Sequence, residues 1–266
     1  MIRTFQQIGS ADLPTVGGKG VNLGVLFRAG FPVPPGFCVT TKGFAAFAAG
    51  CSALPRLYAA LDAVPADDAE AVRVLGAQIR AALLAVPLPD AVAMAAVSAW
   101  QAIGAESAYA VRSSATAEDL PGASFAGQQD TYLNVRGEEA LLDAIRRCFA
   151  SLFTDRAIMY RQKNHFGQRG IGLSVVVQRM VFPDSAGILF TADPVSGHRG
   201  TVTIDAGFGL GEALVSGLVT ADLYRLDKRT GAVKDVRIGD KALAIRALPD
   251  GRTVTEKLSE HDRKTR

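Results

Sequence analysis

The hydrophobic pattern of the chain changes near residue 106, from a helical period to short strand-like runs. Before this point one set of apolar residues recurs at steps of three or four, which is typical of an amphipathic helix: Val72, Leu75, Ile79, Leu83 and Val86. After it, runs rich in β-branched residues alternate with glycine-containing turns. This order predicts an α+β protein with a helical N-terminal part, mixed or antiparallel sheets, and antiparallel hairpins toward the C-terminus.

The same change divides the chain into three expected parts. They are a helical lobe over 1–105, a lobe with a hydroxyl- and glycine-rich segment over 106–182, and a part of strands and hairpins over 183–266. Gly104 suits the C-terminal cap of the last helix of the first part. Residues with side-chain oxygens are expected to cap three helices at their N-termini: Thr41, either Asp67 or Asp68, and Asp90.

Composition excludes several classes of protein. Hydrophobic residues make up 48% of the 266 residues and charged residues 21%, which is the balance of a globular protein with a sizeable core. No apolar run reaches the ~20 residues of a membrane-spanning helix, and the N-terminus lacks the apolar segment of a secretory signal. We therefore expect a cytoplasmic protein without a membrane partner. The net charge of +3 is too small to indicate a nucleic-acid partner.

The three cysteines give no sign of a disulfide framework or a zinc site. They are odd in number and far apart, at Cys38, Cys51 and Cys148. None forms a Cys-x-x-Cys pair. Each is expected to be a buried small hydrophobic residue in a reducing compartment.

A lysine between glycines, Lys19 in the GGKG sequence, lies at the start of a helix predicted over 19–29. The spacing does not match a Walker A loop, which needs a serine or threonine after the lysine where this chain has Gly20. Backbone N–H groups at a helix N-terminus, together with an ammonium group, still suit a phosphate. The alternative is an ordinary turn at the entry of a helix.

The segment 111–135 is a second candidate for phosphate binding. A short strand, AYAVR, delivers Arg112 into a long stretch of glycine, serine and alanine. An arginine can bind phosphates through two N–H groups at once, and small residues let backbone N–H groups approach them. Long loops inside compact domains are usually functional, although an exposed arginine on a surface loop is the alternative.

Two further segments are weaker candidates. Gln178 and Met180 end a buried strand whose backbone could receive a flat purine ring, or could be a plain strand end. The run DAGFGLGEALVSG imitates a dinucleotide fingerprint, but Glu212 replaces its last glycine and repeated βαβ units are not evident. A close-packed backbone turn is the preferred interpretation of the glycines at 207–211, with a dinucleotide-dependent oxidoreductase as the alternative.

Taken in order, these pieces resemble one family closely. VGGKGVNLGVLFRAGFPVPPGFCVTT, YAVRSSATAEDLPGASFAGQQDTYLNV, SVVVQRM, GILFTADPVSG and GFGLGEALVSGLV are similar to the N-terminal nucleotide-binding domain of phosphoenolpyruvate synthase, pyruvate phosphate dikinase and rifampicin phosphotransferase. The resemblance covers roughly residues 5 to 245. It implies an ATP-grasp-like fold that holds ATP between two lobes. It also implies transfer of the β-phosphoryl group of ATP to a histidine on a separate domain, with AMP and phosphate as products.

The resemblance also assigns roles to individual residues. The lysine of GGKG and the arginine of the AYAVR strand would contact the ATP phosphates and carry the catalysis. Gly127 and Thr131 would belong to the glycine-rich loop and the strand after it, which close over the nucleotide. Gln178 would lie at the adenine pocket, with the backbone near Met180.

Two departures from the family limit what this chain is expected to do alone. The phosphohistidine motif and the acceptor-binding domain are absent, so both are expected elsewhere in the enzyme or on another chain. The resemblance also implies that the chain stops, at DRKTR, before the segment with the acidic metal ligands. Magnesium is therefore expected with ATP, but its ligands cannot be named. The alternative function is a non-catalytic nucleotide-binding or interaction module that docks on a separately encoded phosphohistidine domain.

Overall fold

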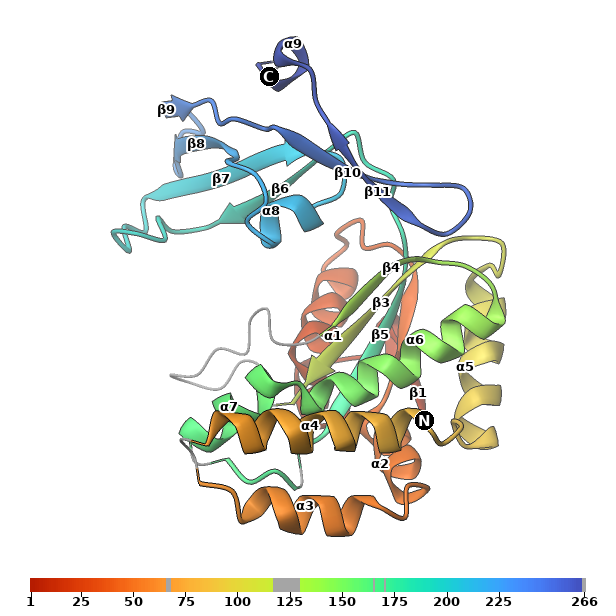
Figure 1. The fold of residues 1–266 in the computed structure, drawn as a ribbon. Coiled ribbons are helices and arrows are strands. Elements are labelled where there is room, and N and C mark those ends of the chain that lie inside the picture. Colours follow the sequence, from red (N-terminus) through yellow and green to blue (C-terminus); the bar gives the residue numbers. More distant parts are fainter. Residues whose placement is uncertain (66–67, 117–129, 165, 170, 265–266) are drawn as a thin grey trace. The chain divides into compact units, whose positions relative to one another are not determined.

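The protein has an α+β fold in two compact units, Met1–Met180 and Val181–Arg266 (Figure 1). The sheets are antiparallel rather than mixed, because every ladder between named strands in the described chain runs antiparallel. No single helix among the described residues is both long enough and apolar enough to span a membrane. The computed structural model describes residues 1–65, 68–116, 130–164, 166–169 and 171–264.

Helices surround a five-stranded sheet in the first unit. Its strands are β1 (Ile2–Thr4), β2 (Gly36–Val39), β3 (Tyr109–Ala115), β4 (Thr131–Val135) and β5 (Leu173–Arg179). Its helices are α1 (Leu13–Arg28), α2 (Thr41–Ala49), α3 (Leu54–Asp62), α4 (Ala69–Leu84), α5 (Asp90–Ile103), α6 (Glu138–Ala150) and α7 (Asp155–Lys163). Short 3-10 helices occupy Phe5–Gln7, Ser10–Asp12 and Ser151–Phe153.

The strand β5 lies at the centre of this sheet, whose order is β1-β2-β5-β3-β4. It pairs with β2 on one side and with β3 on the other. Its first five residues, LSVVV, are all buried. A strand that is covered on both faces has no exposed side to alternate with, which explains why its buried residues are apolar except for Ser174.

Each face of the sheet has its own helical cover, as Figure 1 shows for α1 on one side and α6 on the other. The α1 face holds a small cluster made of Phe5, Ile8, Val16, Cys38 and Val176. The opposite face carries the main hydrophobic core, to which α2, α5 and α6 contribute. The helical period noted near residues 72–86 belongs to α4, whose buried residues include Val72, Ile79 and Leu83.

The predicted helix caps are partly confirmed. The Asp68 carboxylate accepts a hydrogen bond from the N–H of Ala71 at the start of α4. Gly104 ends α5 with a φ of 107°, a left-handed conformation that glycine adopts without strain. The start of α4 and the end of α5 are thus capped as the sequence predicted.

The predicted caps Thr41 and Asp90 are wrong by one position, because each is the first residue inside its helix. Thr40 is the extended residue before α2, and its side chain makes no capping hydrogen bond. The Thr41 hydroxyl instead donates to the carbonyl oxygen of Pro14 at 3.1 Å. Pro89 precedes α5, where its fixed φ suits the entry of a helix.

Arg161 is a fully buried cation that ties α7 to the segment after it. Its Nε donates to Gln168 Oε1 at 2.8 Å and its Nη1 donates to the carbonyl oxygen of Leu152 at 2.7 Å. Its guanidinium also lies 5.6 Å from the ring centre of Phe153. Burial lowers the pKa of Arg161 to about 10, which still leaves it charged at neutral pH. The side chain therefore joins Leu152 and Gln168 to α7 through hydrogen bonds within an apolar core.

Replacement of Arg161 by alanine removes these hydrogen bonds and leaves a cavity. We expect Arg161→Ala to lower the free energy of unfolding by roughly 2–4 kcal/mol in urea titrations. Arg156, an exposed residue of the same helix, is the matched control. Arg156→Ala should change the value by less than about 0.5 kcal/mol, and an equal loss in both variants would contradict the role given to Arg161.

The second unit consists of a four-stranded sheet, a hairpin and two short helices. The sheet has the order β6-β7-β8-β9, and β10 and β11 form the hairpin. The antiparallel hairpins predicted toward the C-terminus are confirmed, since β8 pairs with β9 and β10 with β11. The elements are β6 (Ser185–Phe190), β7 (Thr201–Phe208), α8 (Glu212–Val215), β8 (Asp222–Asp227), β9 (Val233–Arg237), β10 (Leu243–Ala247), β11 (Thr253–Lys257) and α9 (Glu260–Arg263).

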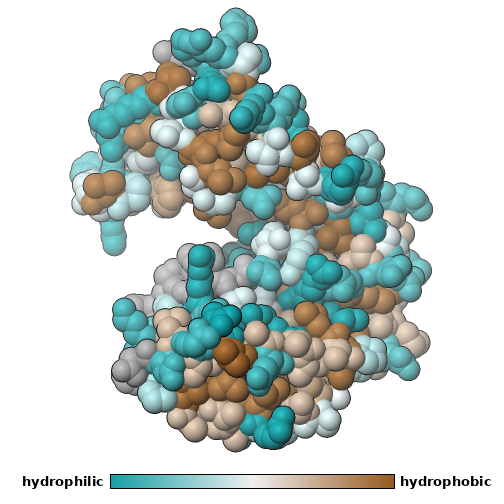
Figure 2. All heavy atoms as spheres, in the orientation of Figure 1, coloured by the Kyte–Doolittle hydropathy of each residue, from teal (hydrophilic) through white to brown (hydrophobic). Residues whose placement is uncertain are grey.

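Ion pairs are prominent among the contacts that stabilise this unit, because few of its apolar side chains are buried. The ammonium group of Lys241, which is 1% exposed, donates to the Asp222 carboxylate, which also accepts the N–H of Gly239 at 2.9 Å. Figure 2 shows apolar side chains at the surface of this unit. Several are more than half exposed: Val181, Phe182, Leu189, Val195, Val215, Leu218 and Val233.

Asp193 should make the free energy of unfolding of the second unit depend on pH in the acidic range. The N–H groups of Ser196 and Val195, with the Arg225 guanidinium, hold the pKa of its carboxyl below the usual value. A lowered pKa in the folded state gives stability above pH ~4, and this stability is lost as the pH falls through the folded pKa.

We therefore expect Asp193→Asn to lower the urea midpoint of unfolding at pH 6. The midpoint of this variant should also fall less than that of the parent when the pH is lowered from 6 to 3. Asp184→Asn is the control, since that exposed side chain makes no hydrogen bond or ion pair with a described residue. A full acid-dependent loss in Asp193→Asn would contradict the assignment.

Candidate functional site

A break in α1 sets the position of Lys19. Gly17 has a φ of 69° and a ψ of 176°, so two helical segments meet at this residue and the second begins directly after it. A Cβ atom at Gly17 would lie 2.4 Å from the carbonyl oxygen of Ser114, so only glycine fits. The helix predicted from Lys19 onward is present, although α1 starts earlier, at Leu13.

Lys19 is half-buried in the first turn after the break. Its charge acts on the thiol of Cys148, whose Sγ lies 3.7 Å from the carbonyl oxygen of Val111 in β3. Burial nevertheless raises the pKa of Cys148 well above its ordinary value, and the Asp130 carboxylate adds to this effect. The thiol therefore stays protonated and is no nucleophile. The turn that contains Lys19 packs on β3, since Gly17 and Gly20 on either side of it both approach Ser114.

Arg112 lies in the middle of β3, directly opposite Thr131 of β4 and Val176 of β5. Directly opposed residues of neighbouring strands point to the same face of a sheet. Val176 packs against Val16 of α1, so Arg112 and Thr131 also project from the face that α1 covers. The strand itself is longer than predicted and continues through Ala115.

Gln178 lies on the same face, two residues beyond Val176 in β5 and opposite Ala110. It is half-buried, and its Nε2 donates to the carbonyl oxygen of Pro34 at 3.4 Å. This bond points the amide toward the loop before β2. The strand end therefore presents a polar group and nearby backbone groups, which suits the edge of a purine ring.

Met180 follows β5, and its N–H donates to the carbonyl oxygen of Ala108 at 2.9 Å. Its side chain is buried, with Sδ accepting the N–H of Asn134 at 2.7 Å. The predicted residues Lys19, Arg112, Thr131 and Gln178 thus gather about one face of the sheet, with Met180 at its end. The predicted loop residue Gly127 lies outside the residues that the structure describes.

Sequence reasoning missed Asn134, which shapes this end of the sheet. It has a φ of 57° and is the one non-glycine residue with a positive φ in the described part of the chain. It lies in β4 where the register with β3 shifts, as in a β-bulge. Asparagine tolerates this conformation better than most residues, but its type alone is too weak a signal to predict it.

The described residues contain no group of three or more His, Cys, Asp or Glu side chains that could hold a metal ion. Magnesium in phosphate sites is normally held by one or two carboxylates together with the phosphates. Lys19 and Arg112 fit the negative charge of phosphates, but the described residues do not form a cage for magnesium.

The glycines of 207–211 form a close-packed turn. Gly209 has a φ of 70°, and a Cβ atom there would lie 2.4 Å from the carbonyl oxygen of Ile245. The strand before the turn, β7, pairs antiparallel with β6 and β8, and α8 after it has four residues. A dinucleotide fingerprint requires a parallel βαβ unit, so the oxidoreductase alternative has no support here.

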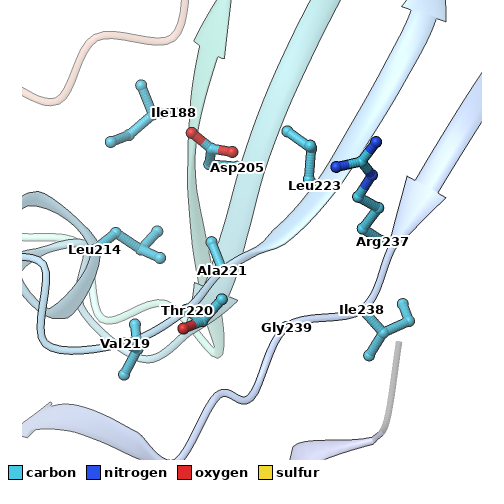
Figure 3. Close-up of a pocket in the computed structure, with 10 residues that line it drawn as sticks. All are labelled: Ile188, Asp205, Leu214, Val219, Thr220, Ala221, Leu223, Arg237, Ile238 and Gly239. Carbon is cyan, nitrogen blue, oxygen red and sulfur yellow. The ribbon is translucent and has the colours of Figure 1, made fainter.

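A cavity of about 420 Å³ opens on the sheet of the second unit (Figure 3). Across neighbouring strands its floor carries Ile188, Asp205, Leu223 and Arg237. Arg237 also pairs with Asp235, outside the cavity lining, at 3.2 Å. The Asp205 carboxylate and the pairing of Arg237 with Asp235 leave no excess positive charge on this floor, which suits a polyphosphate poorly.

Comparison with known proteins is consistent with a nucleotide site in this chain. Residues 13–266 match the pyruvate phosphate dikinase AMP/ATP-binding domain family. The chain is 52% identical to a rifampicin phosphotransferase of Streptomyces sviceus over 94% of its own length and 46% identical to that of Bacillus subtilis over 99%. It is 42% identical to a probable phosphoenolpyruvate synthase of Methanothermobacter thermautotrophicus over 96%.

These relatives are much longer than this chain. The matched region is 29% of the Streptomyces protein, 30% of the Bacillus protein and 38% of the Methanothermobacter protein. The match to the family, in contrast, covers nearly every residue after the first twelve. The chain therefore belongs to the pyruvate phosphate dikinase AMP/ATP-binding domain family.

Proposed function

We propose that this chain binds ATP as the nucleotide-binding part of a dikinase-type phosphotransferase. Its relatives are named rifampicin phosphotransferase and phosphoenolpyruvate synthase. The final acceptor of the phosphoryl group would therefore be the substrate of one of these two kinds of enzyme. ATP would supply a β-phosphoryl group that passes to a histidine on a separate domain, leaving AMP and phosphate. The single observation that carries the proposal is the placement of Lys19 and Arg112 about one sheet face, within a family that binds AMP or ATP.

Each predicted residue has a role in this proposal. Lys19 and Arg112 bind and neutralise the phosphates, because positioning and charge neutralisation dominate phosphoryl transfer. Thr131, exposed and directly opposite Arg112, borders the same phosphates, and Gly127 would close over them. Gln178 and the backbone at Met180 hold the adenine ring. The spacing supports this order, since Gln178 lies two residues along β5 from Val176, the partner of Arg112, or roughly 7 Å.

The finer features of the family also belong to this proposal. One of them is the ATP-grasp-like fold that the resemblance to the family implies. Magnesium would accompany ATP and would be held by carboxylates together with the phosphates. The phosphohistidine and acceptor domains would be the partners of this chain.

Calorimetric titration with a non-hydrolysable ATP analogue and with adenosine tests the phosphate assignment. We expect Lys19→Ala and Arg112→Ala each to raise the Kd for the analogue about 10–100-fold and to leave adenosine binding unchanged, because only phosphate contacts are lost. Lys42→Ala is the matched control, since Lys42 is an exposed lysine at the start of another helix.

Each outcome of these titrations decides between stated alternatives. Unchanged ATP affinity in both variants would show that the phosphate assignment is wrong. A folded chain that binds neither ligand, with or without magnesium, would contradict the proposed function. It would support the interaction module that docks on a separate phosphohistidine domain.

A further inference from the structure

The hydroxyl of Ser114 occupies the gap in the broken helix α1. Ser114 is completely buried in β3, and its Oγ accepts a hydrogen bond from the N–H of Gly20 at 3.3 Å. The same hydroxyl donates to the carbonyl oxygen of Val16 at 2.9 Å. Both partners lie in α1, 94 and 98 residues away in the sequence.

These two partners would bond directly to each other in a continuous helix. An α-helix joins the N–H of each residue to the carbonyl oxygen four residues earlier, which here would join Gly20 to Val16. The left-handed Gly17 separates them. A side chain inserted into such a ladder is a known cause of a sharp helix break. Ser114 thus satisfies both groups that the break would otherwise leave buried without partners.

The insertion also fixes the helix start against the strand that carries Arg112. Ser114 and Arg112 are two residues apart in β3, so their side chains leave the same face of the sheet. Both residues pair with β5, Ser114 opposite Ser174 and Arg112 opposite Val176. The strand is therefore a rigid base, and one hydroxyl connects it to the turn that contains Lys19.

We propose that Ser114 is a positioning residue, which sets the distance between Lys19 and Arg112 for a polyphosphate. This inference rests on the proposed function, since it assumes that the two cations bind the phosphates. A hydroxyl that only stabilised the fold would affect all ligands alike. A hydroxyl that places Lys19 affects ligands in proportion to their phosphates.

The test compares Ser114→Ala with Ser174→Ala in titrations with the ATP analogue and with adenosine. Ser174 is equally buried, lies directly opposite Ser114 and donates to the carbonyl oxygen of Val39 in β2 rather than to α1. We expect Ser114→Ala to raise the Kd for the ATP analogue about tenfold and to change that for adenosine less than twofold. Ser174→Ala should change neither Kd by more than about twofold.

A double variant supplies the second measurement. If Ser114 acts through Lys19, removal of the Ser114 hydroxyl should hardly change the affinity for the analogue once Lys19 is already alanine. The double variant Lys19→Ala with Ser114→Ala should therefore bind the analogue about as weakly as Lys19→Ala alone. Circular dichroism of each variant confirms that it is folded. Should Ser114→Ala fail to fold, Ser114→Cys, which keeps a weaker donor and acceptor, takes its place.

The outcomes separate this inference from the proposed function. Normal analogue binding by folded Ser114→Ala, with weakened binding by Lys19→Ala, would overturn the positioning role and leave the proposed function intact. An equal loss for adenosine and the analogue would also overturn it, since that pattern belongs to a purely structural residue. No analogue binding by the parent chain would instead contradict the proposed function.

Discussion

Burial of the central strand β5 on both faces is the constraint on which the first unit depends. Five successive residues of β5 are buried, with α1 on one side and the main core on the other. Such burial is possible only if β2 and β3 satisfy the backbone groups of the strand. The strand that carries Arg112 is thereby held beside β5 along its full length. The candidate site thus takes its rigidity from the hydrophobic core.

The second unit follows a different physical rule. Its sheet buries few large apolar side chains, and its polar connections include the Lys241–Asp222 pair and the contacts of Asp193 with a turn and with Arg225. Buried charges are costly unless they are paired and hydrogen-bonded, as Asp222 is with Lys241 and Gly239.

Sequence reasoning predicted the α+β class, the long helices and the C-terminal hairpins, because these have strong periodic or turn signals. It also singled out Lys19 and Arg112, which lie in α1 and on the sheet face that α1 covers. It placed Ser114 in a loop, because small hydroxyl residues have no strong strand preference, whereas pairing with β5 extends the strand to Ala115. It placed the N-terminal caps of α2 and α5 at Thr41 and Asp90, whereas the helices already begin at these residues and the cap positions are Thr40 and Pro89.

The serine inserted into α1 also has a consequence for the order of folding. Most helix starts are completed by neighbours in the sequence, but this one needs a hydroxyl 94 residues further along the chain. Closing so long a loop costs conformational entropy before any bond rewards it, and such contacts form slowly. During synthesis the segment around Gly17 emerges well before its partner. Its final geometry therefore waits until β3 has joined the sheet, so the lysine reaches its place only when the strand carrying the arginine is already there.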